Sequence, residues 1–314
     1  MEKIKKKLRG SALLTALFIM TLVAIVATAM STKIQVDIYR TRLIIVHDKL
    51  YLASQAVAFW ALGELNQDKK RYPQVDAQGM IIQYPQKMAT AYPSVVISGG
   101  LYDLQARYNL NNLSNKKAVL GFVNMLSVTA SHISSSEKTK LALSIHDWIS
   151  PYDLARGEDD YLTYYLNLKP PYHPSHQLMS SASELRLVKD VDAKTYLALS
   201  PFITALPEPT PINLNTAPKQ VLMSLSSAIN EEKVAELINE RGDKGFKNLT
   251  KVSELLKKLN ITNEQVTLES AYYLSVAHVN SDNLNFTVYT LFKRSRDKKG
   301  KLSVNIIRES FNVF

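Results

Sequence analysis

One uncharged stretch near the N-terminus constrains this chain more than any other feature. It runs from Gly10 to Thr32 without a charged side chain and directly follows the basic string "KKKLR" (Lys5–Arg9). A helix needs about 20 mostly apolar residues to span a bilayer. Basic residues in front of such a helix favour a cytoplasmic N-terminus. We therefore expect residues 1–10 to be a cytoplasmic leader and residues 11–32 to be a transmembrane helix.

The residues that follow predict that the membrane helix continues beyond the bilayer. Between Lys33 and Asn66 there is no proline, and the only glycine is Gly63. Apolar side chains recur at a spacing of three and four residues, which forms one stripe along a helix. The stripe consists of Leu43, Val46, Leu50, Ala53, Val57 and Trp60. Residues 33–66 are thus predicted to be the amphipathic half of one long helix.

A cleaved secretory signal peptide is the alternative for the N-terminal stretch. The string "ATAMS" (Ala27–Ser31) has the small residues that signal peptidase selects. The unbroken helical pattern after it favours a segment that is kept.

Composition limits the chemistry of the rest of the chain. With 314 residues, of which 46% are hydrophobic, the chain is long enough to bury a core outside the membrane helix. It has no cysteine, which excludes disulfides and thiolate chemistry. The net charge is +10, and a second basic cluster lies in "KRSRDKKGK" (Lys293–Lys301). This cluster has no interleaved aromatic residues, so we interpret it as a solvated hairpin tip rather than a nucleic-acid patch.

Strand signals flank a long helical block. The string "SVVISGGLYDLQARYNLNNL" (Ser94–Leu113) is predicted to be a hairpin that turns at Gly99–Gly100. Three period-two segments near the C-terminus predict strands over 271–279, 284–295 and 302–314. These signals indicate an α+β fold in which the long N-terminal helix packs on a small antiparallel sheet. A large all-α domain would be inserted between the strands.

The expected boundaries follow from this pattern. The first part of the sheet lies in 67–113, the inserted α-helical domain in 114–268 and the C-terminal strands in 269–314. The insert divides at about residue 205, into subdomains over 114–205 and 206–268. Within it, Ser134-x-x-Glu137 predicts a capping box, and Asn230 and Gly242 bound a further helix.

The second subdomain resembles the helix-hairpin-helix modules of DNA-binding proteins. The similar segment runs from "INLNTAP" (Ile212–Pro218) to "RGDKGF" (Arg241–Phe246). In those modules a glycine-containing hairpin donates backbone N–H groups to a phosphate. Here the hairpin "SSAINEE" (Ser226–Glu232) has no glycine and has two carboxylates, which a phosphate would repel. We interpret it as a SAM-like or helix-hairpin-helix-like packing frame. A membrane-anchored DNA-binding protein of the competence type is the alternative.

An acidic segment is the candidate metal site. The string "DWISPYDLARGEDDYL" holds five carboxylates, at Asp147, Asp153, Glu158, Asp159 and Asp160. Calcium takes six to eight oxygen ligands, and carboxylates in a loop suit it. The spacing is not that of an EF-hand, and a solvated acidic loop is the alternative.

Catalytic motifs are missing from the sequence. There is no G-x-S-x-G, no glycine-rich phosphate loop and no H-E-x-x-H, and the pair His173 and His176 has no neighbouring carboxylate or cysteine. We therefore expect no enzyme, no catalytic cofactor and no small-molecule substrate.

The order of basic leader, glycine, apolar helix and amphipathic helix resembles type IV prepilins and type II secretion pseudopilins. In those families a prepilin peptidase cuts after the glycine on the cytoplasmic side, and the apolar helix is kept. The resemblance implies cleavage between Gly10 and Ser11, with Ser11 as an N-methylated N-terminus.

The fifth mature position departs from the family pattern. Most members have a glutamate there, which is understood to meet the N-terminal amine of a neighbouring subunit. This chain has Thr15 instead. A buried charge is costly without a partner, so a subunit that lacks the carboxylate is tolerated most easily at the tip, with no subunit above it.

Five strings along the rest of the chain resemble the K-type minor pseudopilins of type II secretion. In the family's order they are "YDLQARYNLNNL" (Tyr102–Leu113), "DWI" (Asp147–Ile149), "GEDDYL" (Gly157–Leu162), "SASELRLVKDV" (Ser181–Val191) and "INLNTAP". The resemblance implies calcium at the acidic segment, although Ser150 and Tyr152 stand where members often have aspartates.

The same resemblance implies a place and partners. The chain would be a single-pass protein of the inner membrane with its main domain in the periplasm. It would cap a pseudopilus together with the I-type and J-type pseudopilins, with its amphipathic stripe against these subunits, and support protein export across the outer membrane. Contacts with secreted substrates or the outer-membrane channel are further implications. A minor pilin of a type IV pilus is the remaining alternative.

Overall fold

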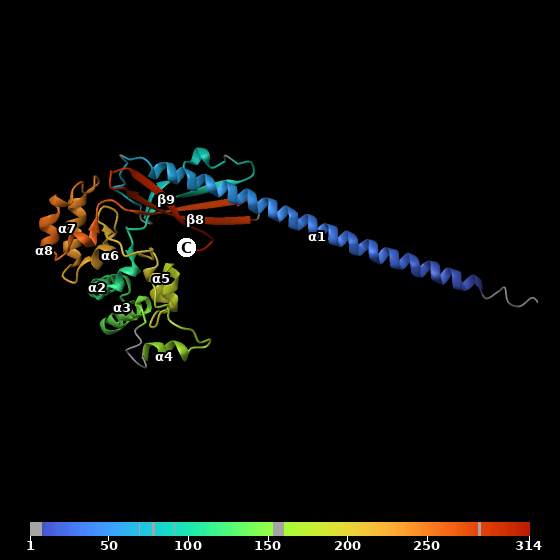
Figure 1. Cartoon of the computed structure of the whole chain (residues 1–314), viewed down its shortest axis with the longest axis horizontal. Coiled ribbons are helices and arrows are strands. Elements are labelled where there is room, and N and C mark those ends of the chain that lie inside the picture. The colour runs from blue at the N-terminus through green and yellow to red at the C-terminus, as the bar shows by residue number, and fades with distance from the viewer. Residues whose placement is uncertain (1–7, 69, 77–78, 91, 153–159, 282–283) are drawn as a thin grey trace, which may run out of the picture. The chain divides into compact units, whose positions relative to one another are not determined.

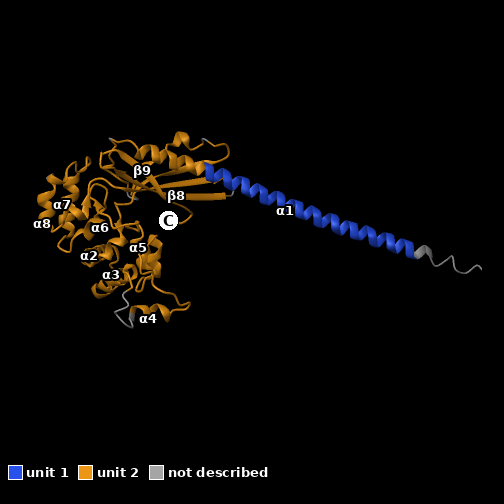
Figure 2. Ribbon diagram, viewed as in Figure 1, with its two compact units in different colours: residues 1–52 blue, residues 53–314 orange. Residues whose placement is uncertain are grey.

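The structure, a computed structural model, describes residues 8–68, 70–76, 79–90, 92–152, 160–281 and 284–314. The chain divides into two compact units, residues 1–52 and residues 53–314 (Figure 2). Helix α1 (Leu8–Leu65) supplies the described part of the first unit and the start of the second. From Ser11 onwards it is long and apolar enough to cross a membrane. The prediction of one helix through the apolar and amphipathic stretches is therefore confirmed.

The second unit contains a five-stranded antiparallel sheet in the order β1-β2-β7-β8-β9 (Figure 1). The strands are β1 (Met80–Gln83), β2 (Val96–Asp103), β7 (Tyr272–Ser281), β8 (Leu284–Arg296) and β9 (Leu302–Phe311). The last two turns of α1 pack on one face of this sheet, where Ala61 and Leu65 form a cluster with Tyr273 and Phe292. The expected C-terminal strands are confirmed. The interpretation of "KRSRDKKGK" as a solvated hairpin tip holds only for its second half, which turns at Gly300, because Lys293–Arg296 belong to β8 and Arg294 is buried.

The predicted hairpin at Gly99–Gly100 is wrong, because β2 runs straight through both glycines. A Cβ atom on Gly99 would lie 1.9 Å from the carbonyl oxygen of Val276 on β7. A Cβ atom on Gly100 would lie 2.5 Å from Sδ of Met80 on β1. The two glycines therefore allow the neighbouring strands β7 and β1 to approach β2 closely. Glycine within a strand can serve such a close approach as well as a turn.

The chain between β2 and β7 forms the predicted helical insert. Its helices are α2 (Val119–Thr129), α3 (Ser135–Ile149), α4 (Asp160–Leu166), α5 (Ala193–Leu199), α6 (Lys219–Leu222), α7 (Glu231–Arg241) and α8 (Ser253–Lys258). The same region contains two short pairs of parallel strands. β3 (Tyr108–Asn109) pairs with β4 (Ile203–Thr204), and β5 (Ile212–Asn213) pairs with β6 (Val266–Thr267). One apolar core extends through these elements.

The helix ends in the insert follow local capping chemistry. The capping box of Ser134 and Glu137 is present at the start of α3, as predicted. The Asn230 side chain accepts a hydrogen bond from the backbone N–H of Lys233 at the start of α7, and Gly242 ends that helix. These signals were readable because they lie within one turn of the helix they bound.

Candidate functional site

The residues of the expected processing site lie at the start of α1. Gly10 is in its first turn, and Ser11 follows on the same helix. The hydroxyl of Thr15 donates to the backbone carbonyl oxygens of Ser11 at 3.1 Å and of Ala12 at 3.0 Å. Thr15 is thus satisfied by its own helix and presents no charge to a neighbour.

Helix α1 has two sets of apolar residues, one buried and one exposed. Ala53 and Val57, from the predicted stripe, are completely buried within the second unit, and Trp60 packs edge-to-face on Tyr84 of that unit, with 5.5 Å between ring centroids. The expectation that this stripe contacts other subunits is therefore wrong for these residues, because the second unit of the same chain buries them.

A second set of apolar residues on α1 is exposed. Ile38, Ile45, Leu52 and Phe59 are 63%, 61%, 58% and 67% exposed. Their spacing is seven residues, the repeat with which one helix packs along another. We call these four residues the seven-residue stripe. Sequence reasoning missed it, because the buried stripe on the same helix has a stronger apolar pattern.

A buried carboxylate joins the sheet to the insert. Asp103, the last residue of β2, is 1% exposed. Its Oδ2 accepts hydrogen bonds from Oγ1 of Thr216 (2.6 Å), Oγ of Ser270 (2.7 Å) and Nδ2 of Asn213 (3.0 Å). Burial raises the pKa of this carboxyl, while the hydrogen bonds oppose the rise. The chain thus leaves the sheet and returns to it at one shared polar centre.

Amide side chains from two of the K-type strings complete this junction. Asn111 donates to the carbonyl oxygens of Met179 and Leu206, and Asn215 donates to those of Phe246 and Leu268. Each also accepts a backbone N–H, so both side chains pair with segments remote in sequence. Such bonds replace backbone pairing in irregular regions. The strings therefore have a structural meaning, which is to hold the insert against itself and the sheet.

The acidic segment lies mostly outside the described residues. Asp153, Glu158 and Asp159 are not described, nor is the side chain of Asp160. Asp147 is half-buried near the end of α3. Within the described part of the chain, no three His, Asp or Glu side chains gather as metal ligands.

The two ends of the acidic segment are nevertheless held together. The hydroxyl of Tyr161, in the first turn of α4, donates to the carbonyl oxygen of Ser144 on α3 at 2.9 Å. Ser144 lies one turn before Asp147 on the same helix. The start of α4 therefore lies beside the last part of α3.

In the hairpin that resembles a DNA-binding module, backbone N–H groups donate to atoms of the same chain. The backbone N–H of Ala228 donates to Oγ of Ser226 at 3.1 Å, and that of Ile229 donates to the Ser226 carbonyl oxygen at 3.3 Å. Nδ2 of Asn124 on α2 donates to the carbonyl oxygens of Met223, Ser226 and Ile229. These two amides are engaged inside the chain, and Asn124 ties the hairpin to α2. This arrangement argues against phosphate binding there.

Comparisons with known proteins agree with this architecture. Family models described as "Type II secretion system (T2SS), protein K" match residues 106–208 and 212–270, together more than half of the chain. The type II secretion system protein K of Aeromonas hydrophila is 25% identical, over 92% of this chain and 94% of its own length. That of Pseudomonas aeruginosa is 29% identical, over 64% of this chain and 61% of its own length.

A solved structure shares the fold. A chain of the GspK-GspI-GspJ complex from the type 2 secretion system of enterotoxigenic Escherichia coli superimposes with a TM-score of 0.68. The match covers 87% of this chain and 99% of that chain at 20% identity. The apolar N-terminal helix, together with the matching family models and relatives, indicates a membrane-anchored, single-pass pseudopilin-like subunit.

The particular family is narrower than this class. The chain belongs to the type II secretion system protein K family and has the role of a minor pseudopilin. The two alternative identities, a competence-type DNA-binding protein and a type IV minor pilin, are set aside by this membership.

Proposed function

We propose that this subunit caps the tip of the periplasmic pseudopilus and, with the I-type and J-type pseudopilins, supports protein export across the outer membrane. Thr15 carries the proposal, because its hydroxyl bonds to its own helix and it has no carboxylate to offer the N-terminal amine of another subunit. A position with no subunit above it is the one that tolerates this substitution best. The relative in the solved GspK-GspI-GspJ complex supports the choice of partners.

We further propose how the chain is processed and placed. Prepilin peptidase cuts between Gly10 and Ser11, and Ser11 becomes the N-methylated N-terminus. The chain stays in the inner membrane through residues 11–32, with its N-terminus in the cytoplasm and its main domain in the periplasm. The basic leader in front of the apolar helix supports this orientation.

The insert over 114–268 acts as a structural platform rather than an enzyme. We assign α6 to α8 to a SAM-like or helix-hairpin-helix-like frame that serves packing, which the Asn124 contacts to the hairpin support. In this position the insert would face secreted proteins or the outer-membrane channel.

Calcium is proposed as a structural ion of the acidic loop. Asp147, Asp153, Glu158, Asp159 and Asp160 are the candidate ligands. The bond between Tyr161 and Ser144 holds the start of α4 next to α3. Five carboxylates within 14 residues of sequence repel one another unless a cation is shared, and the ion would neutralise this repulsion.

The assembly proposal is tested by co-purification from membranes. The seven-residue stripe is the expected contact with the I-type and J-type subunits, because its side chains are apolar and exposed. Phe59→Glu should abolish recovery of tagged I-type and J-type subunits with the full chain. Leu197→Glu on α5 is the matched control, since Leu197 is also 67% exposed. Unchanged recovery with Phe59→Glu would remove the stripe from the interface.

A further inference from the structure

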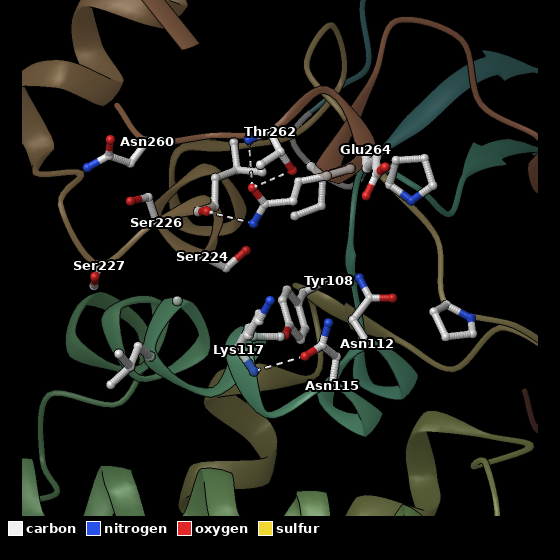
Figure 3. A pocket seen from close by; sticks show the side chains of 18 of the residues that line it. Tyr108, Asn112, Asn115, Lys117, Ser224, Ser226, Ser227, Asn260, Thr262 and Glu264 are labelled. Atoms are coloured by element: carbon white, nitrogen blue, oxygen red, sulfur yellow. Dashed lines mark hydrogen bonds between the residues drawn. The ribbon is translucent and has the colours of Figure 1, made fainter. Parts of the chain in front are cut away.

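A groove of mixed polar and apolar lining crosses the insert between its two halves. One wall is formed by residues 115–121 at the start of α2, and the other by the hairpin residues 224–228 together with 260–265. Residues 209–212 complete the lining, and the groove has a volume of about 690 Å³ (Figure 3). This size is within the range of ligand-binding clefts in proteins, about 300–1,000 Å³. None of the functions proposed above uses it.

Tyr108 lies in this groove and has an unused hydroxyl. Its side chain is 2% exposed, and the hydroxyl has no hydrogen-bond partner among the described residues. Figure 3 shows Tyr108 between the two walls, with Ser224 on one side and Lys117 on the other. Burial raises the pKa of the phenol, so it remains protonated at neutral pH and is a donor. A buried donor without an acceptor is unfavourable, and a ligand in the groove would relieve this.

The walls of the groove are fixed before any ligand arrives. Asn124 ties α2 to the hairpin through three carbonyl oxygens. A Cβ atom on Gly121 would lie 2.1 Å from the carbonyl oxygen of Ser224, so α2 and the hairpin touch at this point. On the far wall, Gln265 bonds both the Leu225 carbonyl oxygen and the backbone N–H of Thr262. The Tyr108 hydroxyl itself has almost no accessible surface, so it meets a ligand only after a small movement of its ring.

The lining selects a class of ligand. Lys117 and Glu264 are exposed on opposite walls, which does not suit a polyanion or a polycation. Tyr108 is the only aromatic residue among the lining residues, and its ring packs on Phe122, with 5.0 Å between centroids. No aromatic face among these residues is therefore open for stacking against a base or a sugar. Hydroxyl and amide groups around a mixed-charge groove are suited to a polypeptide backbone.

We propose that this groove, which we call the Tyr108 groove, binds an extended polypeptide segment. The Tyr108 hydroxyl donates to a backbone carbonyl oxygen of the segment, and Lys117 pairs with an acidic side chain on it. The proposal does not depend on the tip position, because it concerns only residues of the insert.

The test uses the full chain in lipid nanodiscs and phage-displayed random linear peptides as the probe. Peptides with an acidic residue should be enriched over selections on empty nanodiscs. Tyr108→Phe should weaken the affinity of the enriched peptide, made synthetically, by about three- to tenfold, the value of one hydrogen bond. The melting temperature should not fall, because this hydroxyl has no hydrogen-bond partner among the described residues. Lys117→Glu should change the selection towards basic peptides.

A matched variant separates binding from folding. Tyr172→Phe removes a hydroxyl that donates to the Leu187 carbonyl oxygen at 2.8 Å, outside the groove. It should leave peptide affinity unchanged. The proposal is overturned if no peptide is enriched, or if Tyr108→Phe and Lys117→Glu leave the affinity and the charge preference as in the wild type. It is also overturned if Tyr108→Phe lowers the melting temperature.

Discussion

Nε of Arg294 on β8 donates to the carbonyl oxygen of Leu65, the last residue of α1, at 2.9 Å. The same guanidinium donates to the Gln67 carbonyl oxygen at 3.1 Å and pairs with Glu269 at 2.9 Å. The last carbonyls of a helix have no partner within it, and a cation there also offsets the helix dipole. Arg294 therefore joins the end of α1, the sheet and the point where the insert returns.

Arg294→Met should lower the free energy of unfolding by about 3 kcal/mol, because it leaves the carbonyl oxygen of the buried Leu65 without its charged donor and removes one of the two arginines that pair with Glu269. Urea unfolding of the full chain in detergent micelles, followed by tryptophan fluorescence, measures this. Arg296→Met is the control. Its guanidinium pairs with the exposed Asp68 and is itself 36% exposed, so its loss should cost less than about 1 kcal/mol. Equal losses would contradict the capping role of Arg294.

Asp103 predicts a pH dependence of stability. Burial raises the pKa of its carboxyl above the ordinary value of 3.8. The folded chain then binds this proton more tightly than the unfolded chain, so the stability that Asp103 contributes is present at low pH and is lost as pH rises through the folded pKa. Asp103→Asn removes the titration. The difference in free energy of unfolding between wild type and variant should therefore become smaller as pH rises above 3.8, the ordinary pKa of the carboxyl.

Denaturant titrations of both proteins across that range measure the difference. If the difference in free energy of unfolding increases with pH, the donors from Thr216, Ser270 and Asn213 hold the carboxyl ionised against the effect of burial. If the difference does not change with pH, the folded and unfolded chains bind this proton equally.

The features predicted correctly from sequence are local ones. The caps at Ser134 and Asn230 and the alternation in β7 to β9 depend on residues within one turn or one strand. Gly99 and Gly100 were misread because their role depends on Val276 and Met80, which lie on other strands. A glycine pair between apolar runs has the same local appearance in a turn and in a crowded strand.

The long-range polar features were not readable from one sequence. Asp103 appeared as one residue of an alternating strand, and only the fold brings Asn213, Thr216 and Ser270 to it. Tyr108 likewise belonged to a recognisable string without any sign that its hydroxyl lacks a partner. The carboxylates of the acidic segment were found by their density in the sequence, and their role is still a prediction.

Calcium should raise the melting temperature of the full chain. A ligand that binds only the folded state at about 100 times its dissociation constant adds about 2.7 kcal/mol of stability. Differential scanning fluorimetry with millimolar calcium measures the shift, and magnesium at equal concentration controls for ionic strength. The double variant Asp153→Asn with Asp159→Asn should lose the shift. No shift in the wild-type chain would make the segment an ordinary solvated loop.

Gly10→Ala should block processing. The proposed peptidase site requires the glycine before Ser11, so the variant should accumulate as a precursor about ten residues longer, a difference visible on a gel and by intact mass. Gly63→Ala is the control, because a Cβ there meets no atom within 4 Å and lies far from the cut. Normal maturation of Gly10→Ala would remove the prepilin interpretation of the leader.

Thr15→Glu tests the tip position most directly. The variant introduces a carboxylate into an apolar helix, where an acidic side chain costs about 2.5–3.5 kcal/mol unless it is paired. If another subunit stood above this one, the N-terminal amine of that upper subunit would pair with the carboxylate. A tip subunit has no such neighbour. Secretion of a reporter enzyme into the medium should therefore fall in cells that depend on this variant.

The control for Thr15→Glu is Thr15→Val, which removes only a hydroxyl that bonds to the Ser11 and Ala12 carbonyl oxygens of its own helix. It should secrete as the wild type does, because those carbonyls keep their bonds within the helix ladder. Full secretion by Thr15→Glu would mean that its carboxylate finds a partner, and hence that another subunit stands above this one. A defect shared by both variants would instead trace the loss to the hydroxyl and not to the charge.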